Sequence, residues 1–512
     1  MQPNPLMASL SYLRSHACCR FVAIAGCLLA IAGFKFLLIA RAGSPTPYMD
    51  QWMGEAITLY LPYFSHTLTF DHMVGFLSEH RLLLTRVAWL ALLIFNGTWD
   101  PILQMQIGAL IHVMAIGCLL AGLGRVLKLD RLILLLGFAL LFCAVPFGWD
   151  NTLMGYNLHF YLLLLLSILS LFLLARATAW SPEWLLGSLL ATLGYFSFAP
   201  GALILPAAIA TALMQIAVGQ RRSIRELAGI AAHAAIAMVL IYDVQTHIPP
   251  SSAVSHLATS IGEFFSTLMV TASWPVAGGK WPVALQIVPA ALVHGPMLVL
   301  IVQMVRQRPG MSDQRWFYVA IAAWVALQLI AVSFARAGDS LQSRYTDNFL
   351  IGTILNFAAL LSLIGDRVEP QRRKLQSIGA ALWIFVVMLG AGQKAGGQVI
   401  DGVSFRFANG QRQTENVKRF VATGDYGALD KKPESLDIPF PSGAVLRELL
   451  TNPALRAILP PELTGEKPHR PLRDAVLSQG PMLIPIGLAL LLIMATASLA
   501  NPGRDEGDPL PP

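Results

Sequence analysis

The sequence has few charged residues: Asp, Glu, Lys and Arg make up 13% of its 512 residues, against about 25% in an average soluble domain. Hydrophobic residues make up 55%, and the mean hydropathy is +0.60. This composition excludes a soluble globular domain and indicates a multi-span membrane protein. The formal net charge of +7 is modest, and we interpret it as loop charge that sets membrane topology rather than as a nucleic-acid surface.

Cysteine is scarce as well, and no zinc-type Cys/His spacing occurs. All five cysteines lie in or beside apolar segments: Cys18, Cys19, Cys27, Cys118 and Cys143. A glycine-rich phosphate loop, a Walker lysine, a GxSxG elbow and HExxH are absent, as is a soluble nucleotide-sugar domain. An enzyme of this kind would need a donor that is already in the membrane. We predict no metal ligands and no required cofactor, although a divalent metal could assist.

Apolar stretches of spanning length predict an all-α, polytopic membrane helical bundle of about twelve transmembrane helices. They lie near 20–40, 102–125, 132–148, 159–176, 183–199, 202–219, 226–243, 284–305, 316–335, 348–365, 375–392 and 481–500. The run 82–95 is shorter and contains Arg86, so we expect it to lie on the outer surface. The basic loops then fall on one side, which predicts that both termini are cytoplasmic in a multi-pass protein of the bacterial cytoplasmic (inner) membrane.

Three parts are expected along the chain. Residues 1–392 form the transmembrane module, and its first outer loop, 41–101, carries interfacial helices at 52–64 and near 71–77. Residues 393–480 form an outer loop or small cap. Residues 481–512 form the last transmembrane helix and a short cytoplasmic tail.

The first outer loop carries the segment Tyr48-Met49-Asp50-Gln51-Trp52. Charges near a bilayer are costly and commonly functional. The Asp50 carboxylate could take a proton from an acceptor hydroxyl or amine, or it could cap the helix that follows. Gln51, Trp52 and Glu55 are candidate substrate contacts, and Glu55 could equally be a solvated helix residue.

A second polar cluster, Glu79-His80-Arg81, precedes the run 82–95. These side chains could bind a phosphate, position an acceptor or hold a metal, or they could anchor the chain at the interface. Arg344-Tyr345 lies in a short outer loop, where an arginine runs against the positive-inside bias and needs an anionic partner. That partner could be a lipid phosphate, or it could be Asp339 or Asp347. Asp150 and Tyr156 lie in a polar outer turn that could line a sugar pocket.

This order of features resembles the GT-C superfamily of membrane glycosyltransferases, such as protein O-mannosyltransferases and lipid A aminoarabinose transferases. The resemblance rests on Asp50 in the first outer loop, the Glu79-His80-Arg81 cluster and Arg344-Tyr345 before a late span, and it covers roughly residues 1–370. Many members carry two adjacent acids in the first loop. Here Gln51 follows Asp50, so a second acid would be Glu55 or Glu79, or be missing. The pattern is similar to an uncharacterised bacterial branch.

The resemblance implies transfer of a hexose or pentose from a polyprenyl-phosphate donor to a lipid, glycan or protein acceptor in the cell envelope, with inversion. Asp50 would be the catalytic base and Glu79 the second catalytic acid. Arg344, Arg81 and Tyr345 would bind the donor phosphate. Gln51, Trp52, Glu55, His80, Asp150 and Tyr156 would contact substrate. Two alternatives remain open: a polymerase or ligase of lipid-linked glycans that uses arginines of 393–480, and a transporter or flippase.

Overall fold

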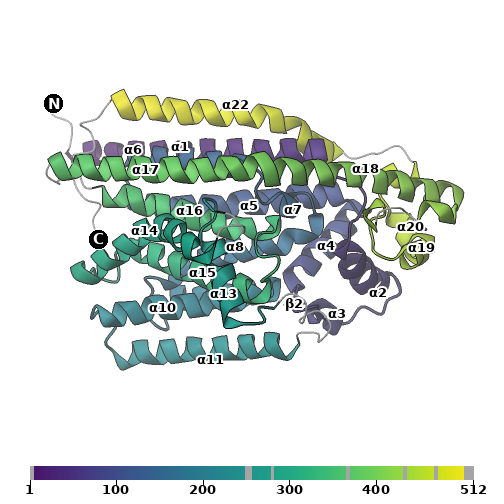
Figure 1. Ribbon diagram of the computed structural model, residues 1–512, viewed down its shortest axis with the longest axis horizontal. Helices are drawn as coiled ribbons and strands as arrows, with labels where there is room; N and C mark the ends of the chain where they lie inside the picture. The colour runs from purple at the N-terminus through teal and green to yellow at the C-terminus, as the bar shows by residue number, and fades with distance from the viewer. Residues whose placement is uncertain are drawn as a thin grey trace.

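The computed structural model describes residues 5–247, 257–277, 282–364, 370–430, 435–465 and 471–500. The predicted tail after Ala500 lies outside them. Within these ranges the protein is a long helical bundle (Figure 1). Its strands are those of one two-stranded antiparallel hairpin, β1 (Phe76–Leu77) and β2 (His80–Arg81).

Ten helical segments are long and apolar enough to span a membrane, so the protein is an all-α, multi-pass membrane protein. The helices that make up the bundle are α1 (Pro5–Ala42), α5 (Pro101–Gly124), α6 (Leu129–Ala144), α8 (Leu158–Leu174), α9 (Pro182–Ser197), η3 (Ala199–Leu203), α10 (Ile204–Ala217), α11 (Ile224–Thr246), α13 (Ile261–Ala272), α14 (Val283–Gln307), α15 (Arg315–Ala335), α16 (Ser343–Leu363), α17 (Pro370–Lys394) and α22 (Pro471–Ala500). Two of the twelve expected spans, α6 and α9, have 16 residues each. Each is about 24 Å long, which is shorter than the ~30 Å hydrocarbon core.

The shorter elements lie in the connections. They are η1 (Trp52–Tyr60), α2 (Leu61–Phe64), α3 (Phe70–Val74), α4 (Leu83–Asn96), α7 (Trp149–Thr152), η2 (Gly155–Asn157), η4 (Ala395–Val399), α18 (Ile400–Thr423), η5 (Tyr426–Ala428), η6 (Ser435–Asp437), α19 (Gly443–Thr451), α20 (Pro453–Ile458) and α21 (Pro461–Thr464). The predicted interfacial helix at 52–64 is present as η1, a π-helix, followed by α2. The run 82–95 forms the 14-residue α4, which is too short to cross a bilayer.

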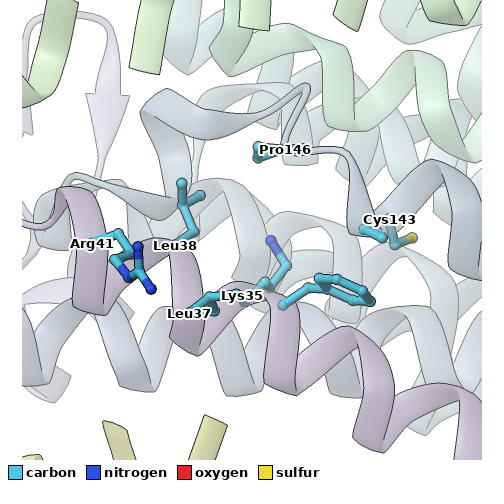
Figure 2. A pocket seen from close by; sticks show the side chains of 8 residues that line it. Lys35, Leu37, Leu38, Arg41, Cys143 and Pro146 are labelled. Atoms are coloured by element: carbon cyan, nitrogen blue, oxygen red, sulfur yellow. The ribbon is translucent and has the colours of Figure 1, made fainter. Parts of the chain in front are cut away.

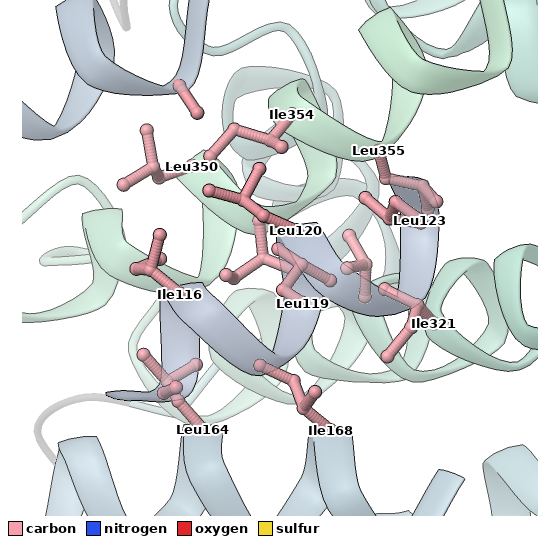
Figure 3. Close-up of a cluster of buried hydrophobic side chains, with 14 of the residues drawn as sticks. Ile116, Leu119, Leu120, Leu123, Leu164, Ile168, Ile321, Leu350, Ile354 and Leu355 are labelled. Atoms are coloured by element: carbon pink, nitrogen blue, oxygen red, sulfur yellow. The ribbon is translucent and has the colours of Figure 1, made fainter. Parts of the chain in front are cut away.

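The centre of the bundle is built from α5, α8, α15 and α16. Along α5, Ile116, Leu119, Leu120 and Leu123 follow the i, i+3, i+4, i+7 spacing of one helix face and are fully buried. Their neighbours come from the other three helices (Figure 3): Leu164, Ile168, Ile321, Leu350, Ile354 and Leu355. By contrast, α22 is largely exposed and packs along α1 at the edge of the bundle (Figure 1).

The helix that starts at α17 does not end at residue 392, where we expected a loop to begin. It continues through the π-helical turn η4 into α18, so that helical structure runs from Lys374 to Thr423. The stretch contains no proline, and each glycine costs a helix only about 1 kcal/mol. At 1.5 Å per residue the 50 residues span about 75 Å, which carries α18 well beyond the hydrocarbon core.

At that end of the bundle, the first loop and the late segment share a second hydrophobic core. We call residues 43–100 and the described residues of 406–465 the cap. Trp52, Trp89 and Trp99 of the first loop pack in the same cluster as Val417 and Leu455 of the late segment. Backbone hydrogen bonds join the two parts as well, from Met49 N to Pro439 O (2.7 Å) and from Trp99 N to Ile458 O (2.7 Å). Figure 1 shows both parts at the same end of the molecule.

Candidate functional site

A cavity of about 550 Å³ lies between the cap and the bundle. Four charged side chains line it: Asp50, Glu79, Arg336 and Arg344. Much of the remaining lining is apolar and comes from η3, α11 and α15, including Leu203, Ile241, Val244, Ala331, Val332 and Phe334. The cavity therefore combines a charged wall beneath the cap with an apolar wall built from membrane-spanning helices.

Asp50 stands at the start of the helix that leads into η1. Met49 before it has a left-handed backbone (φ 46°), which turns the chain into the helix. The Asp50 carboxylate makes no hydrogen bond with any described residue, so the structure does not show it capping the helix, and it lines the cavity. The side chain is exposed to the cavity, but the surrounding walls still partly desolvate its carboxylate. Burial raises the pKa of Asp50, and the positive charge of Arg344 opposes this.

The first turn of α16 brings Arg344 and Tyr345 to the same cavity. Asp50 and Arg344, which are 294 positions apart in the sequence, therefore line one cavity. Asn151 Nδ2 donates to Arg344 O (2.9 Å), and Ser343 Oγ donates to Phe147 O (2.7 Å), so both bonds hold this turn in place. The Arg344 side chain donates to Gln342, while its buried Nε has no partner in the part of the chain that the structure describes.

Arg336, at the end of α15, is the second guanidinium of the cavity. Its Nε donates to the hydroxyl of Tyr345 (3.1 Å), and its side chain forms an ion pair with Glu79. The guanidinium of Arg344 lies 5.5 Å from the centre of the Tyr345 ring. Tyr345 thus sits between two cations. Sequence reasoning missed Arg336, although it breaks the positive-inside bias in the same outer loop as Arg344.

Within the Glu79-His80-Arg81 cluster, Glu79 lies in the turn of the hairpin, while His80 and Arg81 form β2 and point to opposite faces, as successive side chains of a strand do. Glu79 and His80 line the cavity. Arg81 does not: its Nε and Nη2 donate to the Asp243 carboxylate (2.8 and 3.1 Å), and Nη1 donates to Val74 O (2.8 Å). The structure therefore pairs Arg81, which we predicted to bind the donor phosphate, with a carboxylate of α11.

The electrostatics of this hairpin favour a negative Glu79 and a neutral His80. Burial lowers the pKa of His80 to about 4, and the cations of Arg336 and Arg344 act in the same direction. Burial alone would raise the pKa of Glu79, but its charged neighbours outweigh it, and the net pKa is lowered. A His80 side chain with a pKa of about 4 is neutral at pH 7 and carries no charge that could stabilise the Glu79 carboxylate. We therefore assign the lowered pKa of Glu79 chiefly to Arg336.

The other predicted first-loop contacts lie behind the cavity. The Glu55 carboxylate is fully buried in the cap and accepts hydrogen bonds from four side chains: Trp99 Nε1 (2.7 Å), Gln104 Nε2 (2.6 Å), Tyr60 OH (3.0 Å) and Gln51 Nε2 (3.3 Å). Trp52 Nε1 donates to Pro47 O (2.8 Å), and its ring packs edge-on against Trp99. In this structure Gln51, Trp52 and Glu55 hold the cap together and do not line the cavity.

Tyr156 does line the cavity, with Asn157 and His159 beside it. Its buried hydroxyl lacks a hydrogen-bond partner among the described residues and packs against Gly54. Asp150, six residues earlier in α7, is buried, which raises its pKa, and it lies close enough to Arg344 and Arg406 for both charges to oppose this. Asp150 is not among the residues that line the cavity.

No group of three or more His, Cys, Asp or Glu side chains in the described ranges is arranged to hold a metal ion. The sequence matches no model of a known protein family, and it matches no curated protein. What is established is thus an all-α, multi-pass membrane protein with a charged, partly apolar cavity beneath its cap.

Proposed function

We propose that this protein is a membrane glycosyltransferase that moves a sugar from a polyprenyl-phosphate donor to an acceptor on the outer side of the bacterial cytoplasmic membrane. One observation carries the proposal: the Asp50 carboxylate, which has no hydrogen-bond partner among the described residues, and the Arg344 guanidinium line a single cavity that is partly walled by membrane-spanning helices. The pair supplies a base and an anion-stabilising group in one enclosed space. The resemblance of the sequence to the GT-C superfamily points the same way.

In the proposed reaction, an acceptor hydroxyl attacks the anomeric carbon of the donor sugar. The bond from that carbon to the phosphate oxygen breaks, and the polyprenyl phosphate leaves with the electron pair. Asp50 takes the acceptor proton, for which its raised pKa makes it a stronger base than an ordinary aspartate. Attack opposite the departing phosphate inverts the anomeric carbon. Arg344, which lines the cavity, stabilises the charge that grows on the phosphate.

The apolar wall of the cavity suits the lipid part of such a donor. Ile241 and Val244 of α11 face the cavity together with Val332 and Phe334 of α15. An isoprenoid chain can lie against these side chains without desolvating a polar group. The charged wall then receives the phosphate and the sugar at the level of the cap.

The proposed orientation places the cap on the outer side. The basic turns predicted to face the cytoplasm lie at the other end of the bundle. There, Arg20 Nη1 donates to Leu127 O (3.0 Å), and Gln220 Nε2 donates to Arg308 O (3.2 Å). Placing that end in the cytoplasm satisfies the positive-inside rule.

A second candidate, a polymerase or ligase of lipid-linked glycans, is favoured by one contact. The buried guanidinium of Arg406, from the late segment, lies 4.0 Å from the centre of the Tyr48 ring, two residues before Asp50. Three other arginines of this segment form ion pairs within the cap: Arg412 with Asp437, Arg419 with Asp425 and Arg447 with Asp430. A polymerase or ligase would depend on Arg406 more strongly than on Asp50.

Substitution of Asp50 tests the proposal. A deletion strain is complemented with wild type, Asp50→Asn or Arg406→Gln, and its envelope lipids, glycans and proteins are compared by mass spectrometry. Asp71→Asn is the matched control, an exposed carboxylate of the same loop that does not line the cavity. We expect Asp50→Asn to lose the same sugar as the deletion, since removing a general base costs about 10²- to 10⁴-fold in rate. Full retention of the sugar at normal expression would exclude Asp50 as the base.

A further inference from the structure

A second, smaller cavity of about 270 Å³ opens between α1 and the turn that follows α6 (Figure 2). It shares no lining residue with the cavity at Asp50. Two of its lining residues are basic, Lys35 and Arg41, and the others are apolar or cysteine: Phe34, Leu37, Leu38, Cys143, Ala144 and Pro146.

Lys35 is a cation buried in a membrane-spanning helix, with 8% of its surface exposed. Its Nζ donates one hydrogen bond, to Thr152 Oγ1 (3.1 Å), and lies 5.4 Å from the centre of the Tyr161 ring, although an ammonium group has three donors. Figure 2 shows this nitrogen turned from α1 into the hollow, toward the side where Pro146 lies. Because a charged group at membrane depth is costly, donors left free in a cavity indicate a ligand.

Arg41 supplies a second cation near the end of the same helix. It is exposed and makes no hydrogen bond or ion pair with any residue in the described part of the chain. Six residues separate it from Lys35, which corresponds to about 9 Å along a helix. Arg41 is therefore at the level where α1 leaves the membrane, and Lys35 lies deeper.

The charges of this site leave one positive charge uncompensated. Asp347 of α16 lies close enough to Lys35 to act on its charge, so this pair adds no net charge whether both groups are ionised or both are neutral. Arg41 contributes +1 with no counter-charge among the lining residues. A ligand that carries one negative charge would neutralise the site.

The apolar part of the lining selects an amphipathic ligand. Phe34, Leu37, Leu38 and Arg41 follow the i, i+3, i+4, i+7 spacing of one helix face, and the first three are only partly buried. An inorganic ion would leave this apolar strip without a partner. An acyl chain would cover the strip while its phosphate reached the two cations.

We propose that Lys35 and Arg41 form a binding site for the singly charged phosphodiester head group of a membrane lipid, from the leaflet on the cap side. The site takes a phosphate oxygen at Lys35 and Arg41, and it places the acyl chain along Phe34, Leu37 and Leu38. It is independent of the proposed sugar transfer, since it neither lines nor needs the cavity at Asp50.

Lipid binding to the whole purified chain tests the site. The delipidated protein is titrated with short-chain phosphatidylglycerol, with phosphatidylcholine and with inorganic phosphate, and bound ligand is counted by native mass spectrometry. We expect phosphatidylglycerol to bind in preference to phosphatidylcholine. Arg41→Gln should weaken it about fivefold, the ratio that corresponds to ~1 kcal/mol for one basic residue at a membrane surface. Lys418→Gln is the matched control, an exposed cation at the same end of the molecule.

Arg41 is exposed, so Arg41→Gln is expected to fold, and an unchanged melting temperature checks this. Lys35→Met is titrated with phosphatidylglycerol in the same way and tests the buried cation of the site. Wild-type affinity of Arg41→Gln for phosphatidylglycerol would overturn the proposal. Inorganic phosphate that displaces the lipid at equal concentration would also overturn it, because a free anion would then be the ligand.

Discussion

Glu79 and Arg336 form an ion pair that joins the hairpin of the first loop to the turn between α15 and α16. Both residues line the main cavity, whose charged lining is two carboxylates and two guanidiniums. The cavity is thus close to neutral when Asp50 and Glu79 are ionised. An entering phosphate must compete with Glu79 for Arg336.

Removing that competitor should strengthen phosphate binding. In Glu79→Gln, Arg336 loses its carboxylate partner and becomes available to the ligand. We expect the affinity for a short-chain polyprenyl phosphate to rise roughly tenfold, equivalent to ~1.4 kcal/mol. Isothermal titration of the purified protein measures this, with Glu448→Gln, an exposed carboxylate of α19, as control. An unchanged affinity in Glu79→Gln would mean that Glu79 and the phosphate do not share Arg336.

Gly54 lies so close to Tyr156 that we expect even one methyl group added at residue 54 to destabilise the protein. A Cβ at Gly54 would lie 2.5 Å from Cε2 and the hydroxyl of the buried Tyr156 ring. We expect Gly54→Ala to lower stability by about 1–3 kcal/mol, as overpacking does. Sugar transfer should fall as well, because the change lies four residues from Asp50 and displaces a ring that lines the cavity.

The matched control is Gly137→Ala in α6, where an added Cβ meets no atom within 4 Å. Alanine favours a helix over glycine by about 1 kcal/mol, so this variant should be neutral or slightly more stable. Thermal unfolding in detergent measures both variants. Equal melting temperatures for Gly54→Ala and wild type would contradict the packing seen at Tyr156.

The buried carboxyl of Glu55 should make the stability of the cap depend on pH. Burial raises its pKa from an ordinary 4.5 to about 7, although the four donors around it favour the ionised form. Between pH 4.5 and 7 the folded protein then binds more protons than the unfolded chain, so stability falls as pH rises through this window. The difference between these two pKa values corresponds to roughly 3 kcal/mol.

Melting temperatures between pH 5 and 8 test this expectation. Glu55→Gln cannot ionise, so its melting temperature should vary less across the range. It should also be lower, because an NH2 donor replaces one of the two oxygens that accept from the surrounding donors. A wild-type curve that is flat from pH 5 to 8 would show that the carboxyl stays ionised throughout.

The pairing of Arg81 with Asp243 should contribute to stability and leave donor binding unaffected. Their side chains are 19% and 27% exposed, so we expect a coupling energy of about 1 kcal/mol in a double-mutant cycle of Arg81→Gln and Asp243→Asn. The pair Arg419–Asp425 in the cap, 61% and 38% exposed, is the control and should give a coupling near zero. If Arg81→Gln weakened polyprenyl-phosphate binding without loss of stability, the phosphate role predicted from the sequence would be supported instead.

Hydrophobic runs predicted most helices because apolar length and helical spacing are local properties. The helix at 52–64 and the helix that follows Leu82 were located to within about a residue. The hairpin at residues 76–81 was not expected, since two-residue strands leave no periodic pattern. The continuation of α17 into α18 was missed because the polar composition after residue 392 was interpreted as a loop, whereas helix formation needs only the absence of strong breakers.

The candidate site, like the fold, could be predicted from the sequence only in part. Loop charge alone predicted that Asp50 and Arg344 lie on the same side of the membrane. The folded structure shows that they also line one cavity. The partner of Arg81 is 162 residues away in the sequence, so its choice of Asp243 over a phosphate could not be foreseen. Glu55 was similarly ambiguous, because only the folded cap shows that four side chains donate to it.

The second hydrophobic core sets an order of assembly for the cap. Trp52 and Trp99 are synthesised near the beginning of the chain, but Val417, Leu455 and the other late members of their cluster emerge more than 300 residues afterwards. The first loop must therefore wait, with part of its hydrophobic cluster uncovered, until the last fifth of the polypeptide has been translated. A chain truncated after α16 would insert its early spans, but it would lack the late segment that completes the cap above Asp50.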